Sequence, residues 1–250
     1  MSTQSRTAPV GPTRRRSLVG AAVAPDRLGD VDLREAWRFR ARFVDLKPTV
    51  APEDDYRAFC ATVRRGATLW RQRDDAGALR AMIMAILEPA VHEGRPYLHL
   101  EFEYAFLDPE FRRSFASRLA FFSTIARAFV VAGARPIYLV ASTYPAGALS
   151  LDEYFPLWLP GADAGMSDWE RGLRTAIGAA TEGYDPATGL VTMRTLPREP
   201  CRAPKRPRTR ATWEAYQRCC PQWTAGYTPL CLARVTLADT ARSVLGDVPA

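Results

Sequence analysis

Residues 97–119 read YLHLEFEYAFLDPEFRRSFASRL and decide the fold. The first half alternates, with Tyr97, His99, Glu101 and Glu103 set against Leu98, Leu100, Phe102 and Tyr104. This period of two predicts a strand over residues 95–107 with one polar and one apolar face. Apolar residues then recur at intervals of four and three, which predicts a long helix. A strand that runs into a helix in this way brings main-chain amides and arginines to a common phosphate-binding position.

Further elements lie on both sides of this stretch. Proline at residue 52 followed by three acidic residues is typical of a helix start. Asp74-Asp75-Ala76-Gly77 is typical of a hairpin turn. The predicted strands are 18–24, 67–73, 79–87, 136–142, 190–195 and 230–237, with a second turn at 89–94. The predicted helices are 33–44, 52–63, 149–158, 169–182 and 212–218.

The order strand, two helices, three-stranded antiparallel meander, helix, strand, helix resembles the GNAT (Gcn5-related N-acetyltransferase) superfamily over about residues 17–160. Between strand and helix that superfamily has V-x-P-E-[YF]-R-G-x-G-x-G, and this chain has Pro109-Glu110-Phe111-Arg112. The resemblance implies an α/β fold: a mixed, mostly antiparallel sheet flanked by helices. It also implies acyl-CoA, most often acetyl-CoA, as co-substrate. No metal is expected, because the five cysteines lack zinc spacing and the chain has only two histidines. The residues at the implied cofactor-binding positions are Phe106, Leu107, Arg112, Arg113, Ser114, Phe115, Ala116 and Ser117.

The loop departs from the superfamily pattern at both later glycines, which are Phe115 and Ser117 here. Glycine lets the main chain approach a diphosphate closely, and phenylalanine does not. Ser114 and Ser117 can offer hydroxyl groups, and the two preceding arginines supply charge. A second interpretation has Asp108 as N-cap and Pro109 as the first helical residue, with no phosphate loop. A helix that begins near Ser114 favours cofactor binding.

The resemblance also implies catalytic residues. A glutamate on the strand before the loop commonly acts as the base, and Glu101 and Glu103 occupy that strand beside His99. Two carboxylates on one face raise each other's pKa. A tyrosine after the next strand commonly acts as the acid, for which Tyr144 and Tyr154 are candidates. Alternatively, the glutamates face solvent and the tyrosines are packing residues.

The composition is that of a folded protein, with 47% hydrophobic and 24% charged residues. The expected organisation is a disordered tail (1–16), an acyltransferase domain (17–196), a basic, proline-rich linker (197–210) and an extension that packs on the domain (211–250). The net charge of +7 favours anionic partners. The six basic residues between 198 and 210 form the strongest charge run, which is interpreted as a solvated loop or, alternatively, a nucleic-acid contact.

The five cysteines show no disulfide or zinc spacing, and no apolar run is long enough for a membrane span. A cytoplasmic protein is therefore expected. The function expected from the resemblance is transfer of an acetyl or longer acyl group from acyl-CoA to an unidentified acceptor, either small or carrier-bound, most simply an amine. The alternatives are a catalytically silent binding or scaffold domain of the same fold, and a nucleic-acid-binding module.

Overall fold

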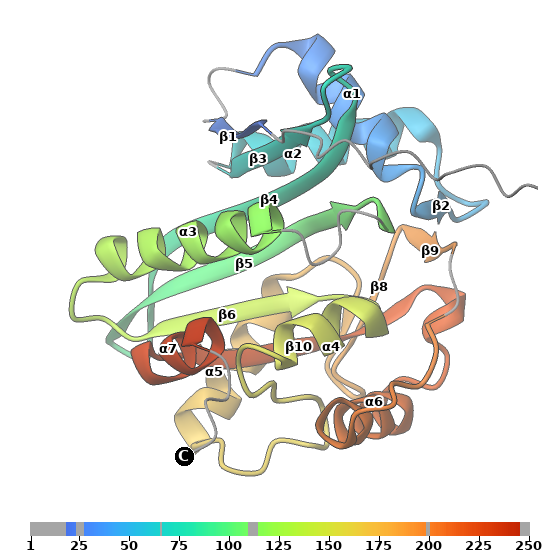
Figure 1. Cartoon of the computed structure of the whole chain (residues 1–250). Helices are drawn as coiled ribbons and strands as arrows, with labels where there is room; N and C mark the ends of the chain where they lie inside the picture. Colours follow the sequence, from blue (N-terminus) through green and yellow to red (C-terminus); the bar gives the residue numbers. More distant parts are fainter. Residues whose placement is uncertain (1–18, 24–27, 66, 110–114, 199–200, 246–250) are drawn as a thin grey trace, which may run out of the picture.

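The computed structural model describes residues 19–23, 28–65, 67–109, 115–198 and 201–245. Its centre is an eight-stranded sheet in the order β1-β3-β4-β5-β6-β10-β8-β7 (Figure 1). All neighbouring strands are antiparallel except β5 and β6, which are parallel. The expected mixed, mostly antiparallel α/β fold is confirmed. The strands are β1 (Val19–Val23), β3 (Thr68–Arg73), β4 (Leu79–His92), β5 (Arg95–Leu107), β6 (Ile137–Ser142), β7 (Tyr184–Asp185), β8 (Leu190–Thr192) and β10 (Tyr227–Val235).

Helices cover both faces of this sheet. The side chains of α1 (Asp30–Arg40) and α2 (Pro52–Arg64) pack on one face, and α5 (Asp168–Ala180) covers the same face further along. The opposite face is covered by α3 (Phe115–Ala132) and α4 (Pro145–Asp152). The last helices are α6 (Pro207–Cys219), which packs on α4, and α7 (Leu237–Leu245). A second, two-stranded sheet pairs β2 (Val44–Leu46) with β9 (Thr195–Pro197).

The turn expected at residues 89–94 is narrower than predicted. Strand β4 continues through Pro89, which lies opposite Leu98, and the chain reverses at Glu93 and Gly94, whose φ angles are 48° and 74°. Two successive positive φ angles are typical of a tight two-residue hairpin turn. Pro89 is tolerated within the strand because β3 begins at Thr68, opposite Ala85. Beyond Ala85 the other edge of β4 has no strand neighbour among the described residues, so no ladder hydrogen bond with them is lost.

The segment 211–250, expected to be an extension, supplies an internal strand. Strand β10 pairs with β6 on one side and with β8 on the other. Leu232 faces α5, whereas Ala233 faces α4, and both are at most 1% exposed. Because both faces are covered, this strand is apolar throughout its centre and shows no alternation. Helix α6 begins at Pro207, inside the expected linker, so residues 198–206 connect β9 to α6.

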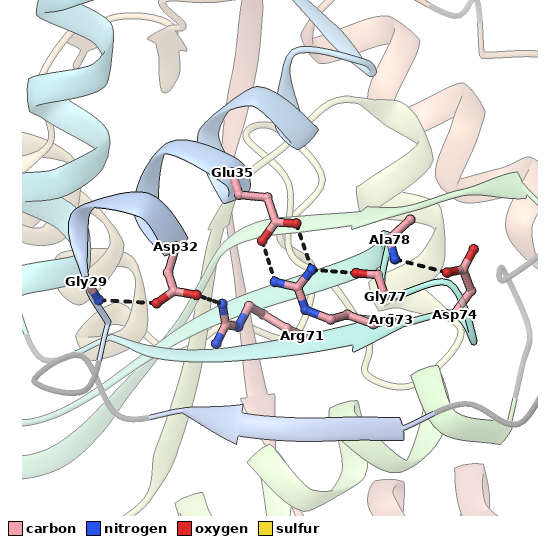
Figure 2. A network of polar contacts seen from close by, with 8 residues as sticks. All are labelled: Gly29, Asp32, Glu35, Arg71, Arg73, Asp74, Gly77 and Ala78. Carbon is pink, nitrogen blue, oxygen red and sulfur yellow. Dashed lines mark hydrogen bonds and ion pairs between the residues drawn. The ribbon is translucent and has the colours of Figure 1, made fainter.

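Ion pairs fix α1 against the sheet. Arg71 and Arg73 lie two residues apart on β3, so both point to the α1 face, where they pair with Asp32 and Glu35 (Figure 2). Asp32 also accepts the main-chain N–H of Gly29, which closes the first turn of α1. These contacts hold the helix over the strands that lead to the candidate site.

Candidate functional site

The parallel strands β5 and β6 separate at the centre of the sheet. They pair from Leu98 with Ile137 to Glu101 with Val140, and no further. Strand β5 then continues to Leu107, while β6 ends at Ser142 and the chain turns into α4 (Figure 1). Within the described chain, the main chain of Phe102–Phe106 pairs only with β4. The edge of β5 that faces β6 therefore offers free N–H and C=O groups at this opening.

A β-bulge lies in β5 at the opening. Met84 of β4 is opposite Tyr104, and the next residue, Ala85, is opposite Phe102, which leaves Glu103 as the extra residue. A bulge changes the direction of the side chains that follow it. Phe102 stacks on Phe121 of α3 with ring centroids 5.0 Å apart. Tyr104 contacts the other face, at 5.3 Å from Phe59 of α2. The sequence alternation placed Tyr104 on the face of Phe102; that prediction is wrong because of the bulge.

The two candidate base residues come together on the α2 face. Glu101 lies 3.5 Å from His99 Nε2 and 3.9 Å from the Arg65 guanidinium. Burial raises the pKa of Glu103 to about 7, and the negative charge of Glu101 and a hydrogen bond with it add to this, against the positive charge of Arg65. A carboxyl group with a pKa near neutrality suits proton transfer at physiological pH. Sequence reasoning expected this pair.

Sequence reasoning missed a buried ion pair beside these carboxylates. Arg40 of α1 is 5% exposed and pairs with Asp55 of α2, which is 2% exposed and also accepts the indole N–H of Trp37 at 2.6 Å. The Arg40 guanidinium lies over the Tyr104 ring, 5.5 Å from its centroid, and its Nε has no partner among the described residues. Burial raises the pKa of Tyr104 to about 12, so this phenol stays neutral. The sequence signal that could have revealed this ion pair is an arginine among the apolar residues of α1.

The two candidate acid residues lie in different surroundings. Tyr144 is the residue before α4, and its hydroxyl donates a hydrogen bond to the Thr195 carbonyl of β9. Tyr154 packs on the α3 face of the sheet, with its ring 4.6 Å from that of Phe121. Burial raises the pKa of both phenols. Tyr144 is thus tied to the small sheet, and Tyr154 lies on the face opposite to Glu101.

Part of the expected phosphate loop, including Arg112, Arg113 and Ser114, lies outside the described residues. The described part of α3 begins with the main chain of Phe115, Ala116 and Ser117. Before the loop, Phe106 stacks on Phe43 at 5.2 Å, whereas Leu107 packs on the opposite face.

The strand end itself is anchored by charge. The carboxylate of Asp108, which is 3% exposed, pairs with Arg42 at 2.9 Å and with Arg80 at 3.2 Å. Neither arginine was singled out from the sequence.

Two shallow hollows lie away from the opening. One, of about 240 Å³, is lined by residues that include Trp158, Glu170 and Arg234, and the other, of about 170 Å³, by residues that include Arg34 and Tyr56. Among the described residues, no three His, Cys, Asp or Glu side chains are grouped as metal ligands would be. No described helix has the length and apolar character needed to cross a membrane.

Comparison with known proteins gives matches among solved structures alone. No protein-family profile and no curated protein matches the chain. Similar structures include an acetyltransferase from Trypanosoma brucei (13% identity, 55% of this chain and 89% of that chain, TM-score 0.37). The ribosomal-protein-S18-alanine N-acetyltransferase from Escherichia coli is similar at 14% identity (57% and 79%, TM-score 0.38). A GCN5-related N-acetyltransferase from Kribbella flavida is similar at 17% identity (58% and 34%, TM-score 0.40).

Proposed function

We propose that the chain is an acyltransferase of the GNAT type, which moves an acetyl or longer acyl group from acyl-CoA to an amine-bearing acceptor. The observation that carries the proposal is the position of Glu103. This carboxyl group lies in a bulge where β5 separates from β6, and its pKa is about 7. An acid–base group at an opening between two parallel strands combines a proton acceptor with free main-chain groups that can hold a substrate.

Glu103 is proposed as the base. An amine is protonated at neutral pH and cannot attack a thioester until it loses that proton. Glu103 takes the proton, either directly or through one water molecule, and the neutral amine then attacks the acyl carbon. Glu101 lies on the same face of β5, and Arg65 contacts it from the end of α2; the charges of both tune Glu103. Tyr104, with its raised pKa, stays neutral and lines the same side.

The acyl donor is proposed to enter from the edge of β5 between Phe102 and Phe106. Acyl-CoA carries two amide groups between its thioester and its diphosphate, and an extended diamide fits an unpaired strand edge. The described part of α3 begins at Phe115, eight residues after β5 ends at Leu107, and a helix N-terminus favours a diphosphate. Phe115 and Ser117 replace the glycines of the family pattern, so the charge of Arg112 and Arg113 is proposed to compensate for the lost close approach.

Tyr154 is proposed as the acid that protonates the departing thiolate. It lies on the α3 face, where the donor would arrive. Tyr144 is proposed as a structural residue, because its hydroxyl is committed to the Thr195 carbonyl. The proposed acyl group is acetyl or longer, and the proposed acceptor is either a small molecule or carrier-bound.

The test combines binding with turnover. Millimolar acetyl-CoA and longer acyl-CoA should raise the melting temperature, since a ligand that binds only the folded state stabilises it. Thiol release with a panel of amines should then identify turnover. Glu103→Gln should lower kcat about a hundredfold or more while leaving the thermal shift intact. Tyr154→Phe should lower kcat, and Tyr144→Phe should lower stability instead. Full turnover by Glu103→Gln would remove the base assignment.

A catalytically silent domain of the same fold is the second candidate, favoured by the loss of both loop glycines. In that case no acyl-CoA changes the melting temperature. A glycine-restored variant, Phe115→Gly with Ser117→Gly, distinguishes the two functions. If the wild type binds acyl-CoA, the two loop arginines are sufficient for binding without the glycines. If only the glycine-restored variant binds it, the wild-type chain has lost acyl-CoA binding.

A further inference from the structure

We propose that Arg65, at the end of α2, is a positioning residue for the carboxyl pair Glu101 and Glu103: its guanidinium, shared between Glu88 and Glu101, sets the pH at which Glu103 takes up and releases a proton. The catalytic use of this exchange rests on the proposed function, but the tuning of Glu103 does not.

The ion pairs are arranged unevenly around the two carboxyl groups. The Arg65 guanidinium lies 3.9 Å from Glu101 Oε2, and His99 Nε2 lies 3.5 Å from the same oxygen. Glu103 has no ion pair of its own among the described residues. A positive charge favours the ionised form of the nearer carboxyl group. The positive charge of Arg65 accordingly opposes the protonated form of Glu103, and the negative charge of Glu101 favours it.

Arg65 is shared between two strands. The same guanidinium nitrogen lies 3.4 Å from Glu88 of β4, and Glu88 is directly opposite His99 in the β4–β5 ladder. Glu88 therefore competes with Glu101 for Arg65. Removing Glu88 takes away a negative charge and leaves Arg65 to Glu101 alone. Both effects favour ionised carboxyl groups, whereas removing Arg65 disfavours them.

The two arginines whose charge reaches Tyr104, Arg40 and Arg194, are already paired. Arg40 of α1 is bound to Asp55 of α2, and Arg194, between β8 and β9, is bound to Glu182 at 2.7 Å. Tyr104 of β5 is neutral because its pKa is raised to about 12. Arg65 is the one of these cations that contacts the carboxyl pair.

The experiment is a carboxyl titration by ¹³C NMR of the full-length protein labelled at glutamate, without any acyl donor. Arg65→Gln should raise the apparent pKa of Glu103 by about half a pH unit, the size expected for an exposed ion pair. Glu88→Gln should lower it. Arg65→Lys should restore most of the wild-type value, and 1 M salt should shrink every shift, since Arg65 is half exposed.

Arg64→Gln is the matched control, because Arg64 is the neighbouring exposed arginine and lines the hollow formed by residues of α1 and α2. It should leave the titration unchanged. Equal shifts in Arg64→Gln and Arg65→Gln, or shifts of the same sign in Arg65→Gln and Glu88→Gln, would overturn the proposal. So would a wild-type titration in which the pKa of Glu103 is not raised.

Failure of the proposed function has a different signature. If the chain shows no acyl transfer but the pKa of Glu103 shifts in the expected directions, the role of Arg65 stands and the proposed function is wrong. If the chain is active but its pH–rate profile and titrations are the same in all four variants, the proposed function stands and the role of Arg65 is wrong.

Discussion

At the scale of single residues, Glu103 has a consequence for stability. Its pKa rises from the ordinary 4.5 to about 7 in the folded protein. The folded state therefore binds this proton more tightly than the unfolded state does. The resulting stabilisation is complete below pH 4.5 and is lost as the pH rises through about 7.

Glu103→Gln should remove this pH dependence. Between pH 5 and pH 8 the wild type should lose up to about 3 kcal/mol more of its unfolding free energy than the variant. Urea denaturation at a series of pH values measures the difference. Glu53→Gln, an exposed position at the start of α2, serves as control and should follow the wild type. Parallel curves for wild type and Glu103→Gln would show that the carboxyl group is solvated.

At the scale of elements, the attachment of α1 to β3 rests on two ion pairs (Figure 2). The hydrogen bond and charge of Arg71 lower the pKa of Asp32. A lowered pKa stabilises the folded state above the usual value of 3.8, and this contribution is lost as the pH falls through the folded value. The Asp32 side chain is 35% exposed, so solvent weakens the pair.

A double-mutant cycle of Asp32→Asn and Arg71→Gln should give a coupling of roughly 0.5 to 1 kcal/mol at pH 7. The coupling should fade in acid. The same cycle on Asp54 and Arg57, which are 54% and 77% exposed, should give nothing measurable. Denaturant unfolding at pH 7 and pH 3 makes the comparison, and a coupling that is unchanged at pH 3 contradicts the assignment.

Elements were predictable from sequence where local chemistry defines them. The turn at Asp74–Gly77 was predictable, because Asp74 accepts the N–H groups of Ala76 and Ala78 and Gly77 has a φ of 78°. The bulge at Glu103 was not predictable, because it depends on how β4 and β5 pair across the sheet. The burial of Arg40 was missed for a similar reason. An arginine enters the core of α1 only because Asp55 on another helix neutralises it.

At the scale of the whole molecule, β10 joins parts of the chain that are far apart in sequence. It pairs with β6 on the side away from β5, and with β8, which is next to the edge strand β7. Sequence alternation could not reveal this, since a strand covered on both faces has no polar side. Strand β10 therefore belongs to the core, and its loss should affect the fold as a whole.

A chain that ends at residue 210 should fail to fold. Without β10, the buried residues of β6, such as Leu139 and Val140, lose their sheet neighbour, and α4 and α5 lose a shared surface. Circular dichroism should then show no cooperative thermal transition. Removal of residues 1–16, expected from the sequence to be a tail, is the matched control and should leave the transition in place. Leu232→Ala should lower stability by about 2 to 5 kcal/mol yet keep the fold. A cooperative transition in the 1–210 chain close to that of the full chain would mean that β10 is an addition to a sheet that is already stable.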